Sequence, residues 1–152
     1  MKDETARPSF APTSVIGKKK VCIVHTKWNY EYVEQLVTQV KSTLMNHEVD
    51  IRVVPGCYEL PIACQKLCRK LHNDLPLYDV VIAVGVLIKG ETYHFEYISQ
   101  SVCHGLMEVQ LTHNIPVIFG VLTVKNEEQV KERIDMNIGK DWGLTALDMS
   151  QF

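Results

Sequence analysis

The chain has 152 residues, of which 46% are apolar, and its formal net charge is −2. This length fits one domain, and this apolar share supports a core that needs neither disulfides nor a structural metal. Acidic and basic residues are interspersed, which excludes the clustered basic face of a nucleic-acid-binding protein, and no apolar run is long enough to cross a membrane as a helix.

The predicted elements alternate between strand and helix. Short runs of apolar, largely β-branched residues mark the strands, and apolar residues that recur every three or four positions mark the helices. In chain order we expect an extended arm over 1–17, a strand over 21–24, a helix over 30–45, a strand over 49–54, a helix over 60–71, a strand over 80–88, a helix over 94–112, a strand over 116–122, a helix that Asn126 caps, and a helix over 142–149 that Asp141 caps. The arm has no periodicity and is ordered only if other residues hold it.

This alternation predicts one α/β domain over residues 18–152. Strands joined by helical crossovers run parallel, and the continuous apolar run of residues 80–88 is typical of a strand covered on both faces. We therefore expect a flavodoxin-like three-layer sandwich, with a four-stranded, mainly parallel sheet and helices on both faces. The five cysteines are an odd number, and residues 1–15 lack the apolar stretch of a secretory signal, so we expect reduced thiols in a cytoplasmic protein.

Ligands of such a sheet bind beyond the carboxyl ends of its strands. The four loops at that edge span residues 25–29, 55–60, 88–94 and 122–126. The third loop runs into a helix N-terminus, where unpaired N–H groups and the helix dipole attract an anion. Gly90 lets a phosphate approach the backbone and Thr92 can donate a hydrogen bond to it, although a simple helix cap has the same pattern.

His94 is predicted in the first turn of the helix that follows this loop. The positive end of a helix disfavours imidazolium, so a neutral imidazole acting as a general base is one interpretation, and a packing or capping role is the other. None of the six histidines has a metal-ligand spacing. Cys64 and Cys68 share a helix face without further ligands near them, which indicates core packing, so we expect no metal.

The first and second loops offer groups suited to an organic ligand. Glu59 either favours the start of a helix or accepts hydrogen bonds from the hydroxyls of a sugar or polyol. Trp28 either packs against its surroundings or stacks on a flat heterocycle. No base is predictable beside Cys57, so we do not expect this thiol to act as a nucleophile.

Several segments of the chain, taken together, match the pattern of a known family. They are VHTKWN (24–29), VPGCYELP (54–61), GVLIKGETYHFEY (85–97), GLM (105–107), PVIFGVLT (116–123), EEQ (127–129) and ER (132–133). In this order they resemble the lumazine synthases over nearly the whole span from Lys20 to Met149. Trp28-Asn29 and Asp141-Trp142-Gly143 resemble the fungal branch of that family most.

The resemblance implies a transferase of riboflavin biosynthesis. It would condense 5-amino-6-(D-ribitylamino)uracil with 3,4-dihydroxy-2-butanone 4-phosphate to give 6,7-dimethyl-8-ribityllumazine, phosphate and water. The amino group of the pyrimidine is itself the nucleophile, so we expect no cofactor. The resemblance also implies a homopentamer with sites between subunits, either alone or packed into a shell of sixty, and it makes riboflavin synthase a candidate partner.

The resemblance also implies roles for individual residues. The expected catalytic residues are His94 and Arg133, and the expected substrate-binding residues are Trp28, Asn29, Cys57, Tyr58, Glu59, Val86, Leu87, Ile88, Glu91, Thr92 and Phe119. Trp28 would stack on the pyrimidine, residues 57–59 would hold the ribityl chain, and residues 86–88 would line the ring pocket. The main chain of residues 91–92 would bind the phosphate. His94 would transfer protons, and Phe119 and Arg133 would come from a neighbouring subunit.

The chain departs from the family after Arg133. The family usually has a longer link to a motif whose basic residue helps to bind phosphate, and Ile138 stands at that basic position here. Lys140 is an alternative cation. Two other functions are therefore left open: a weakly active or inactive relative that binds flavin or lumazine or acts as an assembly scaffold, and a generic phospho-ligand-binding module.

Overall fold

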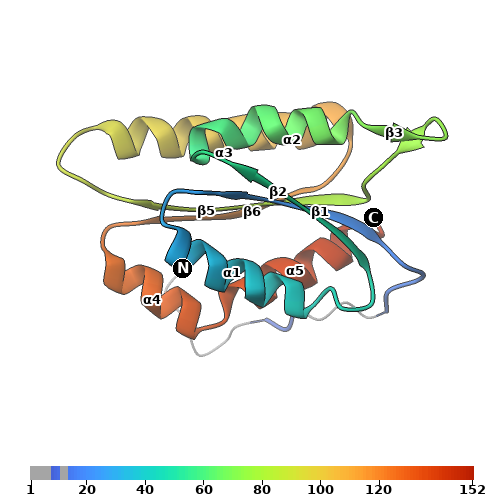
Figure 1. Ribbon diagram of the computed structural model, residues 1–152, viewed down its shortest axis with the longest axis horizontal. Helices are drawn as coiled ribbons and strands as arrows, with labels where there is room; N and C mark the ends of the chain where they lie inside the picture. The colour runs from blue at the N-terminus through green and yellow to red at the C-terminus, as the bar shows by residue number, and fades with distance from the viewer. Residues whose placement is uncertain (1–7, 11–13) are drawn as a thin grey trace.

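A computed structural model of the chain describes residues 8–10 and 14–152 (Figure 1). Its elements are β1 (Lys20–Thr26), α1 (Tyr30–Ser42), β2 (Glu48–Val54), the short 3-10 helix η2 (Cys57–Glu59), α2 (Leu60–Cys68), β3 (Leu71–His72), β4 (Leu75–Pro76), β5 (Val80–Ile88), α3 (His94–His113), β6 (Val117–Val124), α4 (Glu127–Asp135) and α5 (Ile138–Met149). Among the described residues, no helix is both long and apolar enough to span a membrane.

The main sheet lies between two layers of helices. Within the described residues it has four strands in the order β2-β1-β5-β6, and every neighbouring pair is parallel. Helices α2 and α3 cover one face, and α1, α4 and α5 cover the other (Figure 1). The predicted three-layer α/β sandwich is therefore confirmed.

The core is divided between the two faces because successive side chains of a strand point to opposite sides. In β1, Ile23 packs in one cluster with Leu36 of α1. Its neighbours Cys22 and Val24 pack in the other cluster with Leu106 of α3. The same alternation in β5 explains why this strand is apolar at nearly every position, as its continuous sequence pattern predicts.

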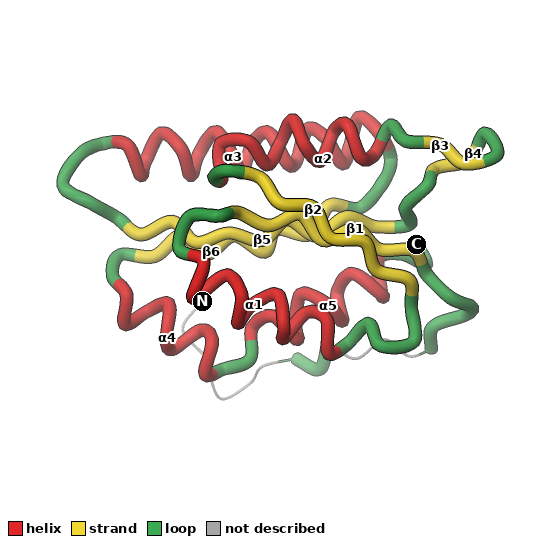
Figure 2. The backbone as a smooth tube through the Cα atoms, in the orientation of Figure 1, coloured by secondary structure: helices red, strands yellow, loops and turns green. Residues whose placement is uncertain are grey.

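The order of the strands reverses between β1 and β5. From β1 the chain crosses to β2 on one side, then returns over β1 to place β5 on its other side (Figure 2). The carboxyl ends of all four strands lie at the left of that view, so the loops after β1 and β5 diverge there. Such a point of divergence leaves a crevice outside the sheet, where ligands of open α/β proteins bind.

The helix predicted over 60–71 is shorter in the structure. Helix α2 ends at Cys68, and Leu71 to Pro76 form a small hairpin that the sequence pattern did not predict (Figure 2). The two turn residues, Asn73 and Asp74, have positive φ angles of 52° and 63°. Apart from Gly, Asn and Asp are the residues that tolerate this conformation best, and the conformation matches the twist of a tight hairpin.

The last helix begins earlier than the sequence pattern indicates. It starts at Ile138 after Asn137, which has a φ of 58°, so Asp141 lies inside the helix and the predicted Asp141 cap is wrong. Gln39 of α1 accepts the Gly139 N–H (3.0 Å), which satisfies a donor of the first turn. The predicted Asn126 cap is confirmed, since its Oδ1 accepts the Gln129 N–H (2.9 Å).

Part of the predicted arm lies outside the described residues, namely 1–7 and 11–13. The rest forms neither helix nor strand. Residues near its end contact the C-terminus: the Gln151 amide accepts the Ile16 N–H (2.9 Å) and donates to the Ser14 carbonyl (2.6 Å). These two hydrogen bonds fix the end of the arm to the C-terminus.

Candidate active site

A cavity of about 610 Å³ opens beyond the carboxyl ends of β1 and β5, at the point where the strand order reverses. Its lining residues come from the loops after β1 and β2, from the end of β5 and from the start of α3. They are Trp28, Asn29, Gly56, Cys57, Tyr58, Glu59, Val86, Leu87, Ile88, His94 and Ile98. Nine of these eleven residues belong to the predicted site. The volume falls in the range of small-molecule sites.

Trp28 lies on the loop after β1, which is fixed to the neighbouring strand. The N–H of Lys27 donates to the Val54 carbonyl (2.9 Å), and the Trp28 N–H donates to the Pro55 carbonyl (3.3 Å). One ring edge lies over Gly56, where an added Cβ would approach Cδ1 of Trp28 to 3.2 Å. The residue is nevertheless 73% exposed, so its side chain can contact a ligand.

Asn29 connects two of the loops that line the cavity. Its Nδ2 donates to the Val86 carbonyl near the end of β5 (2.9 Å). Asn29 directly precedes α1 and has a left-handed backbone conformation, with a φ of 58°. The amide therefore ties the Trp28 loop to β5. This contact also occupies the carbonyl of Val86, which is one of the three residues expected to bind a ring through the backbone.

Glu59 shapes the loop after β2. Its Oε2 accepts the Gly56 N–H (3.0 Å), which closes the turn that contains η2 and leads into α2. The carboxylate is half-buried and lines the cavity. Both interpretations of Glu59 are thus compatible, because one oxygen supports the helix start while the carboxylate also borders the space where a polyol could bind.

The Cys57 thiol is buried beneath this loop. Burial raises its pKa to about 12, and a hydrogen bond from the Val86 backbone opposes this only in part. A Cβ added to Gly85 would lie 2.6 Å from this sulfur, so the Cys57 side chain packs closely against β5. A thiol that stays protonated is a poor nucleophile, in agreement with the expectation from the sequence.

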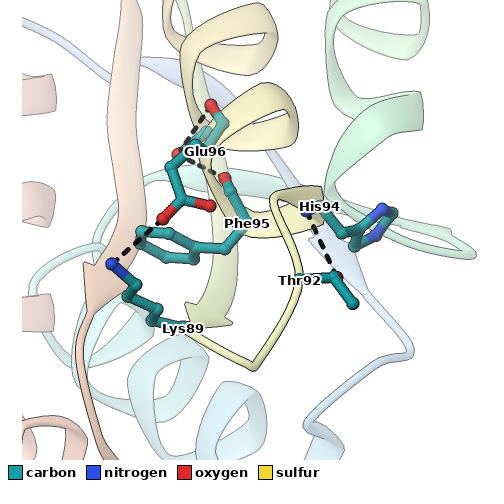
Figure 3. A network of polar contacts seen from close by, with 6 residues as sticks. Lys89, Thr92, His94, Phe95 and Glu96 are labelled. Carbon is teal, nitrogen blue, oxygen red and sulfur yellow. Dashed lines mark hydrogen bonds and ion pairs between the residues drawn. The ribbon is translucent and has the colours of Figure 1, made fainter.

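His94 is the first residue of α3 (Figure 3). It is also one of the residues that line the cavity. Its backbone N–H points to Thr92 Oγ1 at 3.4 Å, a long contact, and Tyr93 makes no side-chain cap. His94 is exposed, so a bound molecule could reach the imidazole. Glu59 and His94 approach the same space from different loops, which gives it a carboxylate and an imidazole.

Four residues of the predicted site do not line the cavity. Glu91 and Thr92 lie exposed on the loop just before His94. Phe119 lies on β6 and is 39% exposed, and Arg133 lies on α4 with Nη1 3.7 Å from Glu132 Oε2. Among the described residues that line the cavity, there is no lysine or arginine.

The departure at Ile138 has a structural explanation. Ile138 is the first residue of α5 and packs against the core cluster between the sheet and α1. Its side chain therefore contributes to packing. Lys140, the alternative cation, is exposed on the same helix and lies outside the cavity lining.

Two lining residues, Gly56 and Ile98, were not predicted as part of the site. Gly56 belongs to the same loop as Cys57, and Ile98 lies one helical turn after His94, so both could have been inferred from their spacing. No cluster of side chains suited to hold a metal ion occurs in the described part of the chain.

The fold and cavity are those of an open α/β protein that binds a small molecule at the edge of a parallel sheet. The family model for 6,7-dimethyl-8-ribityllumazine synthase matches residues 18–152. The chain therefore belongs to the 6,7-dimethyl-8-ribityllumazine synthase family.

Individual relatives agree with this assignment. The 6,7-dimethyl-8-ribityllumazine synthase of Schizosaccharomyces pombe is 44% identical over 149 residues, covering 91% of this chain and 91% of that protein. The enzyme of the same name from Pyricularia oryzae is 38% identical over 171 residues, covering 86% of each. That of Sulfurimonas denitrificans is 38% identical over 130 residues, covering 82% of this chain and 81% of the other. The fungal relatives confirm the expected resemblance to the fungal branch.

Proposed function

We propose that the protein condenses 5-amino-6-(D-ribitylamino)uracil with 3,4-dihydroxy-2-butanone 4-phosphate to form 6,7-dimethyl-8-ribityllumazine. The observation that supports this most directly is that Trp28, Glu59 and His94 line one cavity. They supply, in that order, a flat ring, an acceptor for hydroxyl groups and a proton carrier. Family membership supports the same activity. The position of the cavity, where the strand order reverses, is where such a fold binds its ligands.

The reaction requires two bond-forming steps that the substrates can perform themselves. The 5-amino nitrogen of the pyrimidine attacks the ketone, and loss of one water gives an imine. Loss of phosphate follows, and the ribityl-bearing nitrogen then attacks the second carbonyl and expels a second water. No electrons leave the two substrates, so the products balance without an oxidant or a cofactor. Holding both molecules in register can supply roughly 7–11 kcal/mol when the geometry is ideal.

Residues of the cavity match the needs of the pyrimidine substrate. The exposed Trp28 side chain can stack on the heterocycle, and the backbone of Leu87 and Ile88 can hydrogen-bond its edge, while Val86, whose carbonyl accepts from Asn29, lines the pocket. Glu59, beside Tyr58, can accept hydrogen bonds from the hydroxyls of the ribityl chain. Because the Cys57 side chain is buried, its contribution is through the backbone.

His94 is proposed to move the protons. It would accept the proton of the attacking amine and return protons to the departing oxygens, a contribution of roughly 10²–10⁴-fold in rate. Its exposure at the cavity supports this role. The start of α3 and the main-chain N–H groups of Glu91 and Thr92 would bind the phosphate, as a helix N-terminus favours an anion.

We propose further that the site is completed by a second copy of the chain, within a homopentamer. A leaving phosphate requires a cation, and the described lining residues include no lysine or arginine. Arg133 of a neighbouring copy would contact the phosphate, and Phe119 of that copy would lie against the ring. A planar guanidinium suits a phosphate better than an ammonium does.

Arg133→Ala tests this assignment. We expect KM for the phosphate substrate to rise much more than KM for the pyrimidine. Lys131→Ala, an exposed cation on the same helix, is the matched control and should change neither constant appreciably. Equal losses for the two substrates would contradict the role of Arg133.

We propose that residues 18–152 form one domain, that the protein works in the cytoplasm, and that riboflavin synthase, which would consume the product, is a partner. The free state of all five cysteines supports a reducing compartment. Fractionation and co-purification would test the location and the partner.

The activity itself is tested with purified protein and both substrates. We expect a fluorescent lumazine to form faster than in a protein-free control, because the condensation also proceeds slowly without a catalyst. Formation at the rate of that control would contradict the proposed activity and leave the fold unchanged.

A further inference from the structure

An ion pair spans the loop between β5 and α3. Nζ of Lys89 lies 3.1 Å from Oε1 of Glu96 (Figure 3). Lys89 directly follows β5, and its backbone N–H donates to the Val124 carbonyl at the end of β6 (2.9 Å). Glu96 lies in the first turn of α3. The pair therefore joins the sheet to the helix and closes residues 90–95 into a loop.

Other contacts hold this loop weakly. Tyr93 provides no side-chain cap for α3, and the contact from the His94 N–H to Thr92 is long. Residues 90–93 are exposed. A Cβ placed on Gly90 would meet no heavy atom within 4 Å, so the backbone there borders open space. The ion pair, whose Lys89 and Glu96 side chains are 52% and 36% exposed, therefore adds a side-chain restraint at the start of α3.

The Glu96 carboxylate is paired through one of its two oxygens, Oε1. Its Oε2 is buried and has no hydrogen-bond partner among the described residues. A buried carboxylate oxygen without a donor is unfavourable, and the nearby ammonium of Lys89 compensates for it. The backbone N–H of Glu96 and then the Lys89 ammonium lower the pKa of this carboxyl, so it stays charged near neutral pH.

The charge of Lys89 has a second consequence for an anion at the same helix end. Without the ammonium, the Glu96 carboxylate would leave a bare negative charge in the first turn, where it would repel a phosphate. Figure 3 shows Glu96 directed to Lys89 on one side of the turn and His94 directed to the other side. Glu96 and His94 share this first turn of α3, so a shift of the turn at Glu96 would also move the backbone of His94.

We propose that Lys89 and Glu96 are positioning residues, which fix the first turn of α3 so that His94 faces the cavity and the loop N–H groups face the phosphate. The proposal rests on the proposed function and assigns neither residue a contact with the reacting atoms. Its substrate-specific consequence is that breaking the pair should impair the phosphate substrate more than the pyrimidine.

The test uses the full chain with Lys89→Met, Glu96→Gln and the double variant. Each single change should lower kcat about tenfold and raise KM for the phosphate substrate, while KM for the pyrimidine stays within about twofold. The double variant should be no worse than the poorer single, because both changes break one pair. Lys89→Arg should restore most of the activity, and Lys41→Met, an exposed lysine near the end of α1, is the control.

Hydrogen exchange of residues 90–98 gives a readout that does not depend on turnover. Exchange should be faster in Lys89→Met and Glu96→Gln than in the wild type and the Lys89→Arg variant. Unchanged exchange and kinetics in the single variants would overturn the proposal, as would additive losses in the double variant. Equal rises in both KM values with a lower unfolding midpoint would also overturn it, since they indicate general destabilisation. A wild type without activity but with the expected exchange pattern would instead overturn the proposed function.

Discussion

The two reactive side chains of the cavity, Cys57 and His94, differ in their exposure. The Cys57 sulfur is buried against β5, and burial holds the pKa of its thiol near 12. The His94 imidazole lies on the surface of the cavity at the start of α3. A proton carrier has to reach both substrate and solvent, so this difference favours His94 over Cys57 for the chemistry.

Replacing His94 should affect the rate far more than the fold. We expect His94→Gln to lower kcat by roughly 10²–10⁴-fold, because a neutral amide cannot transfer protons in this way. The unfolding midpoint should stay close to that of the wild type, since the side chain is exposed. Steady-state kinetics and thermal unfolding check both statements, and a variant that keeps wild-type kcat would exclude a proton-transfer role.

Buried thiols should resist alkylation in the folded protein. At pH 8 a thiol of ordinary pKa is about one-tenth ionised, whereas a pKa near 12 leaves about one part in 10⁴ as thiolate, and the thiolate is the reactive form. We expect iodoacetamide to spare Cys57 until the chain is unfolded, as mass spectrometry of digested protein would show. Cys64, which is buried in the same cluster and whose pKa burial also raises, should behave alike. Rapid labelling of Cys57 in the native state would contradict this packing.

At the scale of elements, β5 approaches η2 closely through Gly85. A Cβ at this position would lie 2.6 Å from Cys57 Sγ and 3.2 Å from Thr26 Cγ2, both of them buried. Gly85→Ala should therefore lower the free energy of unfolding by about 1–3 kcal/mol, the usual effect of overpacking. Chemical denaturation measures this change.

Gly90→Ala is the matched control for that substitution. An added Cβ meets nothing within 4 Å, so stability should change little. The same methyl group would project into the open space beside the proposed phosphate position, and KM for the phosphate substrate should rise. A Gly90→Ala loss of stability as large as that of Gly85→Ala would contradict the packing difference between the two positions.

The strands and most helices could be predicted because hydrophobic periodicity reports burial directly. The run over 80–88 coincides with β5, since both of its faces are covered. The end of α2 could not be predicted, because the Asn73-Asp74 turn overrides an apolar pattern that continues to Leu71. The start of α5 depends on Gln39, which is distant in the sequence.

The site could be predicted as far as the topology of the sheet determines it. Trp28, Glu59 and His94 follow different strands, yet parallel strands bring their carboxyl ends to one edge, and the structure joins all three at one cavity. Phe119 and Arg133 lie elsewhere in the chain's own fold. Their proposed roles come from the family resemblance and require a second copy.

For the whole molecule, the central question is what completes the cavity. It is open, its described lining carries no cation, and a phosphate must leave from it. A second copy that contributes Arg133 would supply this cation. In a closed ring, each copy would then give its Arg133 to the site of one neighbour and receive the Arg133 of the other neighbour. Two inactive variants with complementary defects should therefore restore each other.

The most direct measurement is the activity of mixed particles made by co-expressing His94→Gln and Arg133→Ala chains. If each site takes His94 from one copy and Arg133 from its neighbour, random mixing leaves about a quarter of the sites intact, so about a quarter of wild-type activity should return. Native mass spectrometry would verify that the particles contain both chains. Mixed particles no more active than the average of the two separate variants would contradict a site shared between copies.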